Sequence, residues 1–159
     1  MSAAYNVLLV GHETLELGAT GAILSEHFQL RLATSSAAAL ALLDRQPFDA
    51  LCTDLILPDR TGLQLLRSAS KMQPSLAGVL IAYSRKYREY CGAWERQLLF
   101  SLVLKPFPPG ELTATVLRAI TLARLKRTLA CVRPEPSNKQ HVKAQERLAL
   151  ASRPLEQLA

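Results

Sequence analysis

Two oppositely charged side chains stand directly after apolar runs of the sequence. Asp54 follows the run 48–53 (FDALCT), and Lys105 follows the run 101–104 (SLVL). An ammonium group beside a carboxylate can neutralise a phosphoryl group placed on that carboxylate, and a lysine point charge suits phosphate oxygens. The two residue types therefore indicate phosphate chemistry on Asp54 with Lys105 in support.

Two other apolar runs end in polar residues. Gly11, His12 and Glu13 follow the run 6–10, while Tyr83 and Ser84 follow the run 78–82. In a doubly wound sheet, the chemistry belongs at the carboxyl ends of the parallel strands. We therefore expect these residues to lie near Asp54 and Lys105.

The elements that must position these residues follow from the hydrophobic pattern. Short apolar runs alternate with helical periodicity, which is typical of βα units around a parallel sheet. The predicted strands are 6–10, 29–33, 48–53, 78–82 and 101–104. The predicted helices are 15–27 with Thr14 as N-cap, one capped by Ser35 or Ser36 that runs through Leu43, then 63–72, 85–99 and 109–130.

Length and charge set the domain organisation. The 159 residues, 49% of them hydrophobic, suit one domain with a short extension. Of the net charge of +6, residues 1–123 carry +1 and residues 124–159 carry +5. We predict a globular domain over 1–130, a linker over 131–140 that contains Pro134 and Pro136, and a basic amphipathic tail over 141–159.

Several classes of protein are excluded or disfavoured. Cys52, Cys91 and Cys131 form no CxxC pair, so neither a disulfide scaffold nor a zinc ribbon is indicated. No apolar run has the length of a membrane span and no leader precedes the first strand, so we expect a cytoplasmic protein without membrane contact. The basic tail has no aromatic residue to stack on bases, which disfavours a nucleic-acid partner.

The segments around Asp54 (DLILPDRTG) and Lys105 (LKPF) resemble the phosphoacceptor and lysine motifs of response-regulator receiver domains, over about residues 5–127. The resemblance implies a (βα)5 flavodoxin-like three-layer sandwich with strand order 2-1-3-4-5. It implies phosphorylation of Asp54 by a sensor histidine kinase in two-component signalling. It also implies that the Lys105–Pro106 peptide bond can be cis.

Receiver domains normally carry two adjacent acids after the first strand, which hold Mg²⁺ together with the phosphoacceptor. Here Gly11-His12 takes that place, with Glu13 next. Glycine offers no side-chain ligand, and histidine suits zinc or copper better than magnesium. What remains is a weak candidate Mg²⁺ site of His12, Glu13, Asp54 and the backbone carbonyl of Ile56. A one-residue shift that brings Glu13 into the acid pair is the alternative.

Two other family positions are altered as well. Tyr83 stands where the family has a Thr or Ser that meets the phosphoryl group, and a shift of one residue would place Ser84 there. Tyr83 is bulky enough to crowd the site or cover Asp54. The family's switching aromatic position holds Leu102. The alternative to phosphorylation is that Asp54 and Lys105 form only a structural ion pair.

An aromatic series follows the fourth predicted strand. Tyr83, Tyr87, Tyr90 and Trp94 recur at helical spacing among arginines and lysines. Such a stripe packs a helix on its sheet, but it also suits a protein-binding surface, for which we take Tyr87, Tyr90, Trp94 and Leu102.

The sequence thus indicates a non-enzymatic receiver domain with an atypical site. It would act through contacts of the helix 85–99, the strand 101–104 and the helix 109–130. Its partners would be a histidine kinase or another signalling protein. The alternative is a phosphorylation-independent adaptor or homodimer whose basic tail docks onto a protein or nucleic acid.

Overall fold

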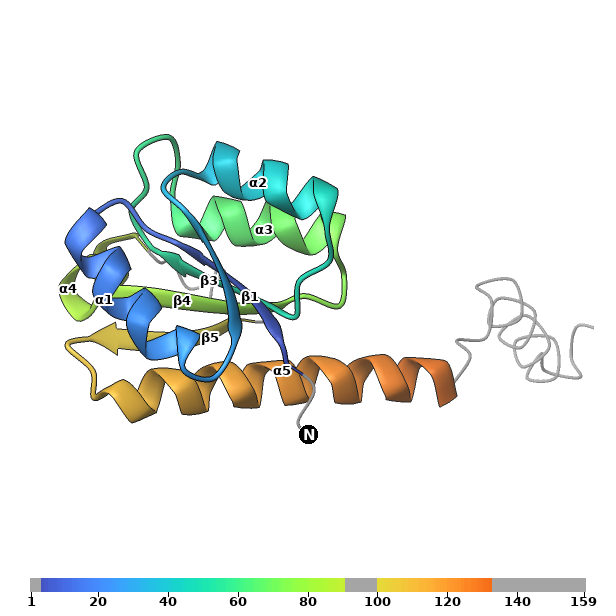
Figure 1. The fold of residues 1–159 in the computed structure, drawn as a ribbon. Helices are drawn as coiled ribbons and strands as arrows, with labels where there is room; N and C mark the ends of the chain where they lie inside the picture. The colour runs from blue at the N-terminus through green and yellow to red at the C-terminus, as the bar shows by residue number, and fades with distance from the viewer. Residues whose placement is uncertain (1–3, 91–99, 133–159) are drawn as a thin grey trace, which may run out of the picture. The chain divides into compact units, whose positions relative to one another are not determined.

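The computed structural model describes residues 4–90 and 100–132, in which five strands alternate with five helices (Figure 1). The strands are β1 (Asn6–Val10), β2 (Gln29–Ala33), β3 (Ala50–Asp54), β4 (Ala77–Tyr83) and β5 (Phe100–Lys105). The helices are α1 (Thr14–Ser25), α2 (Ser36–Arg45), α3 (Gly62–Met72), α4 (Ser84–Tyr90) and α5 (Pro109–Val132). The predicted alternation is confirmed. The predicted end of the fourth helix lies outside the described residues.

All strand pairs are parallel, and the sheet order is β2-β1-β3-β4-β5. The order implied by the family resemblance is therefore confirmed. Strand β3 ends one residue later than predicted, so that Asp54 is itself its last residue and pairs in register with Ile81. At the other side of β4, Tyr83 is in register with Lys105. The register thus carries Asp54, Tyr83 and Lys105 to one edge of the sheet.

Two cores cover the two faces of the sheet, and successive residues of β1 divide between them. Val7 and Leu9 belong to the core formed with α1 and α5, whereas Leu8 and Val10 belong to the core formed with α2 and α3. Side chains alternate across a strand, so a continuous apolar run is what a strand covered on both faces requires. Figure 1 shows this three-layer arrangement.

The helix starts agree with the predicted caps in one case and differ in another. Ser35 caps α2, and its hydroxyl accepts a hydrogen bond from the amide of Ala38. Thr14, the predicted cap of α1, is instead the first helical residue, and Glu13 occupies the cap position without a capping side-chain bond. This prediction was wrong. The helix therefore begins one residue earlier than expected.

The loop after β3 is anchored to the start of α2 by Asp59. Its carboxylate accepts hydrogen bonds from the amides of Ser36 and Ala37, both 3.0 Å long, and from the Ser36 hydroxyl at 2.6 Å. These donors belong to the first turn of a helix, where a negative charge is also favoured by the helix dipole. The hydrogen bonds to Ser36 lower the pKa of Asp59 from 3.8 to about 2.

We expect Asp59→Ala to lower the melting temperature at neutral pH, because two first-turn amides of α2 lose their acceptor. A pKa that is lower in the folded protein stabilises the fold above the ordinary value of 3.8, and this contribution is lost as pH falls toward about 2. The difference from wild type should therefore shrink across that range. Asp44→Ala, which removes an exposed carboxylate near the other end of α2, is the control in thermal melts.

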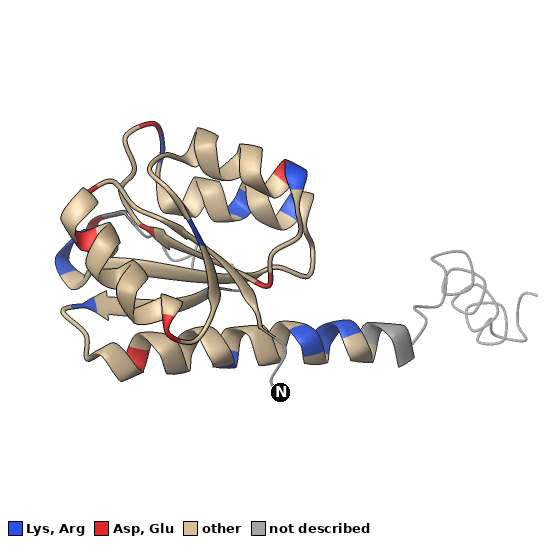
Figure 2. Ribbon diagram, viewed as in Figure 1, with Lys and Arg blue, Asp and Glu red and all other residues tan. Residues whose placement is uncertain are grey.

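The chain divides into two compact units, residues 1–125 and 126–159. The predicted linker and tail fall largely on residues outside the described part, so their bounds stay a prediction. The second half of α5 carries Arg124, Lys126 and Arg127, before its last turn (Figure 2). Among the described helices, none combines the length and the apolar character that crossing a membrane requires.

Candidate functional site

The site is formed where β3, β4 and β5 end. Lys105 Nζ lies 3.2 Å from Asp54 Oδ1, and both side chains are largely buried, 13% and 21% exposed. The peptide bond between Lys105 and Pro106 is cis, as the resemblance implied. The structure thus brings together the two residues that the sequence marked for phosphate chemistry.

A second carboxylate, which was not predicted from the sequence, also binds Lys105. Glu16 in the first turn of α1 accepts a hydrogen bond of 2.8 Å from Lys105 Nζ through Oε2. Its other oxygen, Oε1, accepts a hydrogen bond of 2.9 Å from the hydroxyl of Tyr83. One ammonium group is therefore shared between the carboxylates of Asp54 and Glu16. We call Glu16, Asp54, Tyr83 and Lys105 the strand-end site.

Tyr83 contacts both Lys105 and Glu16. Its ring centroid lies 5.1 Å from Lys105 Nζ, within the range of a cation–π contact. Its hydroxyl is bound to Glu16, and the side chain is 49% exposed. Tyr83 therefore flanks the lysine at the rim and holds Glu16.

Gly11 packs closely against the carboxylate of Asp54. A Cβ atom at this position would lie 2.8 Å from Asp54 Oδ2 and 3.2 Å from a methyl group of Leu17. Any side chain here would press on the carboxylate. The first member of the family's acid pair is therefore replaced by a residue that keeps Asp54 uncrowded.

Burial and the shared ammonium shift the pKa values of the site in opposite directions. Desolvation raises the pKa of Asp54, although Lys105 and the backbone amide of His12 oppose this shift. The hydrogen bonds from Lys105 and Tyr83 lower the pKa of Glu16. Burial lowers the pKa of Lys105, but Glu16 and Asp54 outweigh this effect and raise it overall. Lys105 is therefore held in its charged form.

The described donor set at this edge of the sheet is a poor one for Mg²⁺. Gly11 brings no ligand, and His12 and Glu13 are both exposed. Both carboxylates that converge on the site, those of Asp54 and Glu16, already bind Lys105. No group of three or more His, Cys, Asp or Glu side chains is placed to hold a metal in the described ranges 4–90 and 100–132. The set of His12, Glu13, Asp54 and the Ile56 carbonyl stays a prediction.

Of the remaining predicted residues, the structure describes the side chains of Ser84, Tyr87 and Leu102. Ser84 is the exposed first residue of α4. Tyr87 and Leu102 are half-buried against the core shared with α2 and α3, so part of each side chain serves packing. The backbone of Tyr90 ends α4, but its side chain and the whole of Trp94 lie outside the described part. The predicted partner surface is therefore untested.

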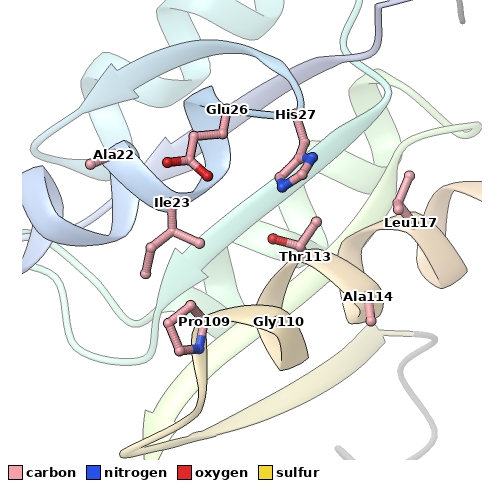
Figure 3. A pocket seen from close by; sticks show the side chains of 9 residues that line it. All are labelled: Ala22, Ile23, Glu26, His27, Pro109, Gly110, Thr113, Ala114 and Leu117. Atoms are coloured by element: carbon pink, nitrogen blue, oxygen red, sulfur yellow. The ribbon is translucent and has the colours of Figure 1, made fainter.

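A groove of about 530 Å³ lies elsewhere, between α1 and the start of α5 (Figure 3). It contains none of the strand-end residues. Its lining is mostly apolar, with Glu26 and His27 at the α1 end; the lining residues are Ala22, Ile23, Glu26, His27, Pro109, Gly110, Thr113, Ala114 and Leu117. The groove thus has no contact with the chemistry of Asp54.

Helical periodicity contains the signal for Glu16. Leu17 and Leu24 of α1 are buried in the core, so a residue one position before Leu17 lies at the border of the buried face. An acid at this border, in the first turn of α1, can reach across to the edge of the sheet. Glu13 was predicted because it directly follows the positions of the missing acid pair, but it precedes the helix.

Comparisons with known proteins agree with this geometry. Residues 7–117 match the response regulator receiver domain family. The hydrogenase transcriptional regulatory protein HoxA of Cupriavidus necator is 28% identical over 114 residues, which is 72% of this chain and 24% of HoxA. The chain thus spans about a quarter of the length of this curated relative.

Solved structures show the same fold. NtrX from Brucella abortus is 27% identical with a TM-score of 0.72, covering 82% of this chain and 30% of NtrX. A CheY-like receiver domain protein from Methanospirillum hungatei has a TM-score of 0.68 at 21% identity, covering 78% of this chain and 99% of its own.

Proposed function

This chain belongs to the response regulator receiver domain family, and on that basis we propose that Asp54 is its phosphoacceptor in two-component signalling. The observation that carries the proposal is the 3.2 Å contact between Lys105 Nζ and Asp54 Oδ1 at the ends of β5 and β3, which lie on either side of β4. The donor would be the phosphohistidine of a sensor kinase. The output would pass through protein contacts of α4, β5 and α5.

The chemistry of the transfer follows from the two groups. A carboxylate oxygen of Asp54 attacks the phosphorus of the donor, the bond from phosphorus to the histidine nitrogen breaks, and an acyl phosphate forms on Asp54. The new phosphoryl group carries more negative charge than the carboxylate it replaces, and the ammonium of Lys105 is placed to neutralise part of it. Lys105 supports both the transfer and the product.

The absence of the acid pair at Gly11 and His12 makes this site atypical for the family. With the ammonium of Lys105 as the positive charge in contact with Asp54, we expect transfer to be slow and to depend little on Mg²⁺. The site would then suit a signal in which the phosphoryl group on Asp54 turns over slowly.

We expect acetyl phosphate to label the wild-type chain slowly and Asp54→Asn to reduce the label to background, because the attacking oxygen is removed. Intact-protein mass spectrometry with and without Mg²⁺ measures this result. Asp44→Asn, which removes an exposed carboxylate on α2, should label like the wild type. Fast labelling that requires Mg²⁺ would contradict the atypical mechanism, and labelling that survives in Asp54→Asn would contradict the assignment of Asp54.

A second candidate function, phosphorylation-independent association, has an observation in its favour. Leu122 and Leu125 on α5 are each 54% exposed at a spacing of three residues, which places them on one face of the helix. A second copy or an adaptor partner could cover them. The same Asp54→Asn variant separates the two functions, because association of this kind would be unchanged in it.

A further inference from the structure

The two unusual residues of the strand-end site are bound to each other. Glu16 accepts a hydrogen bond from Tyr83, and Tyr83 stands at the position where receiver domains have a small hydroxyl residue. Glu16 comes from α1 and Tyr83 from the end of β4, so the hydrogen bond joins two elements across the site. Because they are bound to each other and both lie next to Lys105, we consider the two residues as one unit.

Both residues also contact the same ammonium group. Lys105 Nζ donates to Glu16 Oε2 at 2.8 Å, which is shorter than its 3.2 Å contact with Asp54 Oδ1. The Tyr83 ring lies 5.1 Å from the same nitrogen. By distance, Glu16 is the closer of the two carboxylates to Lys105. We call Glu16, Tyr83 and Lys105 the clasp.

From this geometry we infer that Glu16 is a positioning residue that holds Lys105 and competes with a phosphoryl group on Asp54 for its ammonium. The inference rests on the proposed function for the part that concerns phosphorylation. A phosphoryl group on Asp54 would need the same ammonium and would meet a second negative charge on Glu16. Charge-assisted hydrogen bonds to an ammonium are the strong kind, so the competition should be measurable.

The inference predicts that Glu16→Gln frees Lys105 to serve Asp54. In the reaction with acetyl phosphate, the oxygen–phosphorus bond of the donor breaks, acetate leaves, and the phosphoryl group bonds to the Asp54 carboxylate. We expect the initial rate at Asp54 to rise about tenfold in Glu16→Gln. Glu26→Gln is the matched control, since it neutralises an exposed glutamate that follows the same helix and lies in the separate groove (Figure 3).

A second measurement does not depend on phosphorylation. The acetylation rate of Lys105 by an N-hydroxysuccinimide ester, followed by peptide mass spectrometry, reports whether the ammonium is held. We expect Lys105, whose side chain is 13% exposed, to react slowly in the wild type and in Glu26→Gln. It should react several-fold faster in Glu16→Gln, because one of its two carboxylate partners is gone.

The outcomes separate the two proposals. An unchanged acetylation rate of Lys105 in Glu16→Gln would overturn the clasp, whatever happens to the labelling. A higher acetylation rate without labelling in any variant would support the hold on Lys105 and would refute Asp54 as phosphoacceptor. A higher acetylation rate with an unchanged, measurable labelling rate would overturn the competition. A rise in both rates in Glu16→Gln, but not in Glu26→Gln, is the expected result.

Tyr83→Phe tests the third member of the clasp, because it removes the hydroxyl bound to Glu16 and keeps the ring beside Lys105. We expect both rates to rise in the same direction as in Glu16→Gln but by a smaller factor. If both rates equal those of the wild type, the role assigned to Tyr83 is wrong.

Discussion

Gly62→Ala should lower the free energy of unfolding by about 3 kcal/mol. A Cβ atom at Gly62 would overlap the backbone carbonyl oxygen of Asp54 and would also press on the methyl group of Thr53. The close approach is fixed by backbone, since the Gly62 amide donates a 2.6 Å hydrogen bond to the carbonyl of Leu55. The methyl group of the new alanine can be accommodated only if α3 moves away from the end of β3.

Urea denaturation measures this effect, and Gly18→Ala is the matched control. Gly18 lies on the exposed face of α1, and a Cβ atom there would meet nothing within 4 Å. Alanine in that helix should stabilise the protein by about 0.5–1 kcal/mol. If Gly62→Ala unfolds at the same urea concentration as the wild type, α3 and Asp54 are not packed as closely as described.

Lys105→Met should have the other large effect and lower the free energy of unfolding by about 1–3 kcal/mol at neutral pH. The methionine keeps the apolar stem but removes the charge shared by Asp54 and Glu16, so two carboxylates are left facing each other. Solvent reduces the loss, because the Glu16 side chain is 42% exposed. Because of this screening, the expected loss of stability is smaller than it would be for a fully buried ion pair.

The pH dependence of this loss has a definite sign. Desolvation already raises the pKa of Asp54, and removal of Lys105 takes away the charge that opposes this shift. The variant therefore binds protons more readily when folded, and it should regain stability as pH falls through the pKa of Asp54. The difference from the wild type should be largest at neutral pH and smaller near pH 4, measured by urea denaturation at each pH.

Two variants serve as controls for Lys105→Met. Lys71→Met removes an exposed lysine in the last turn of α3 and should cost only a few tenths of a kcal/mol. The double variant Lys105→Met with Glu16→Gln removes one of the two facing carboxylate charges and should recover part of the loss. A double variant that is as unstable as the sum of the single ones would show that Glu16 and Lys105 do not interact.

Much of the fold was predictable because its signals are local in the chain. The run 6–10 is apolar at every position after Asn6, as both-face burial demands, and its bounds as a strand were predicted correctly. Ser35 was one of two predicted caps of α2, and it has the expected bond to Ala38. The family motifs around Asp54 and Lys105 then led to the strand order, since they occur at fixed places in that fold.

Other parts of the site were not predictable from those signals. Glu16 and Lys105 are 89 positions apart, and no sequence pattern near either residue indicates that they are in contact. The sequence also suggested Thr14 as the cap of α1, where the structure has it as the first helical residue. The hydrogen bonds of Asp59 were not predicted either, because its partners Ser36 and Ala37 belong to the first turn of α2, more than 20 positions earlier in the chain.

The sequence by itself thus determined the alternating elements, the family and the two residues Asp54 and Lys105, because apolar periodicity and short motifs are read within a few neighbouring positions. The tertiary structure alone decided that Glu16, rather than Glu13, reaches the lysine and that Tyr83 binds this glutamate. That choice depends on the rotation of α1 about its axis as Leu17 and Leu24 pack into the core. Periodicity places Glu16 beside the buried face of α1, but packing over long sequence separations sets which residue it meets there, so no local pattern identifies Lys105 as its partner.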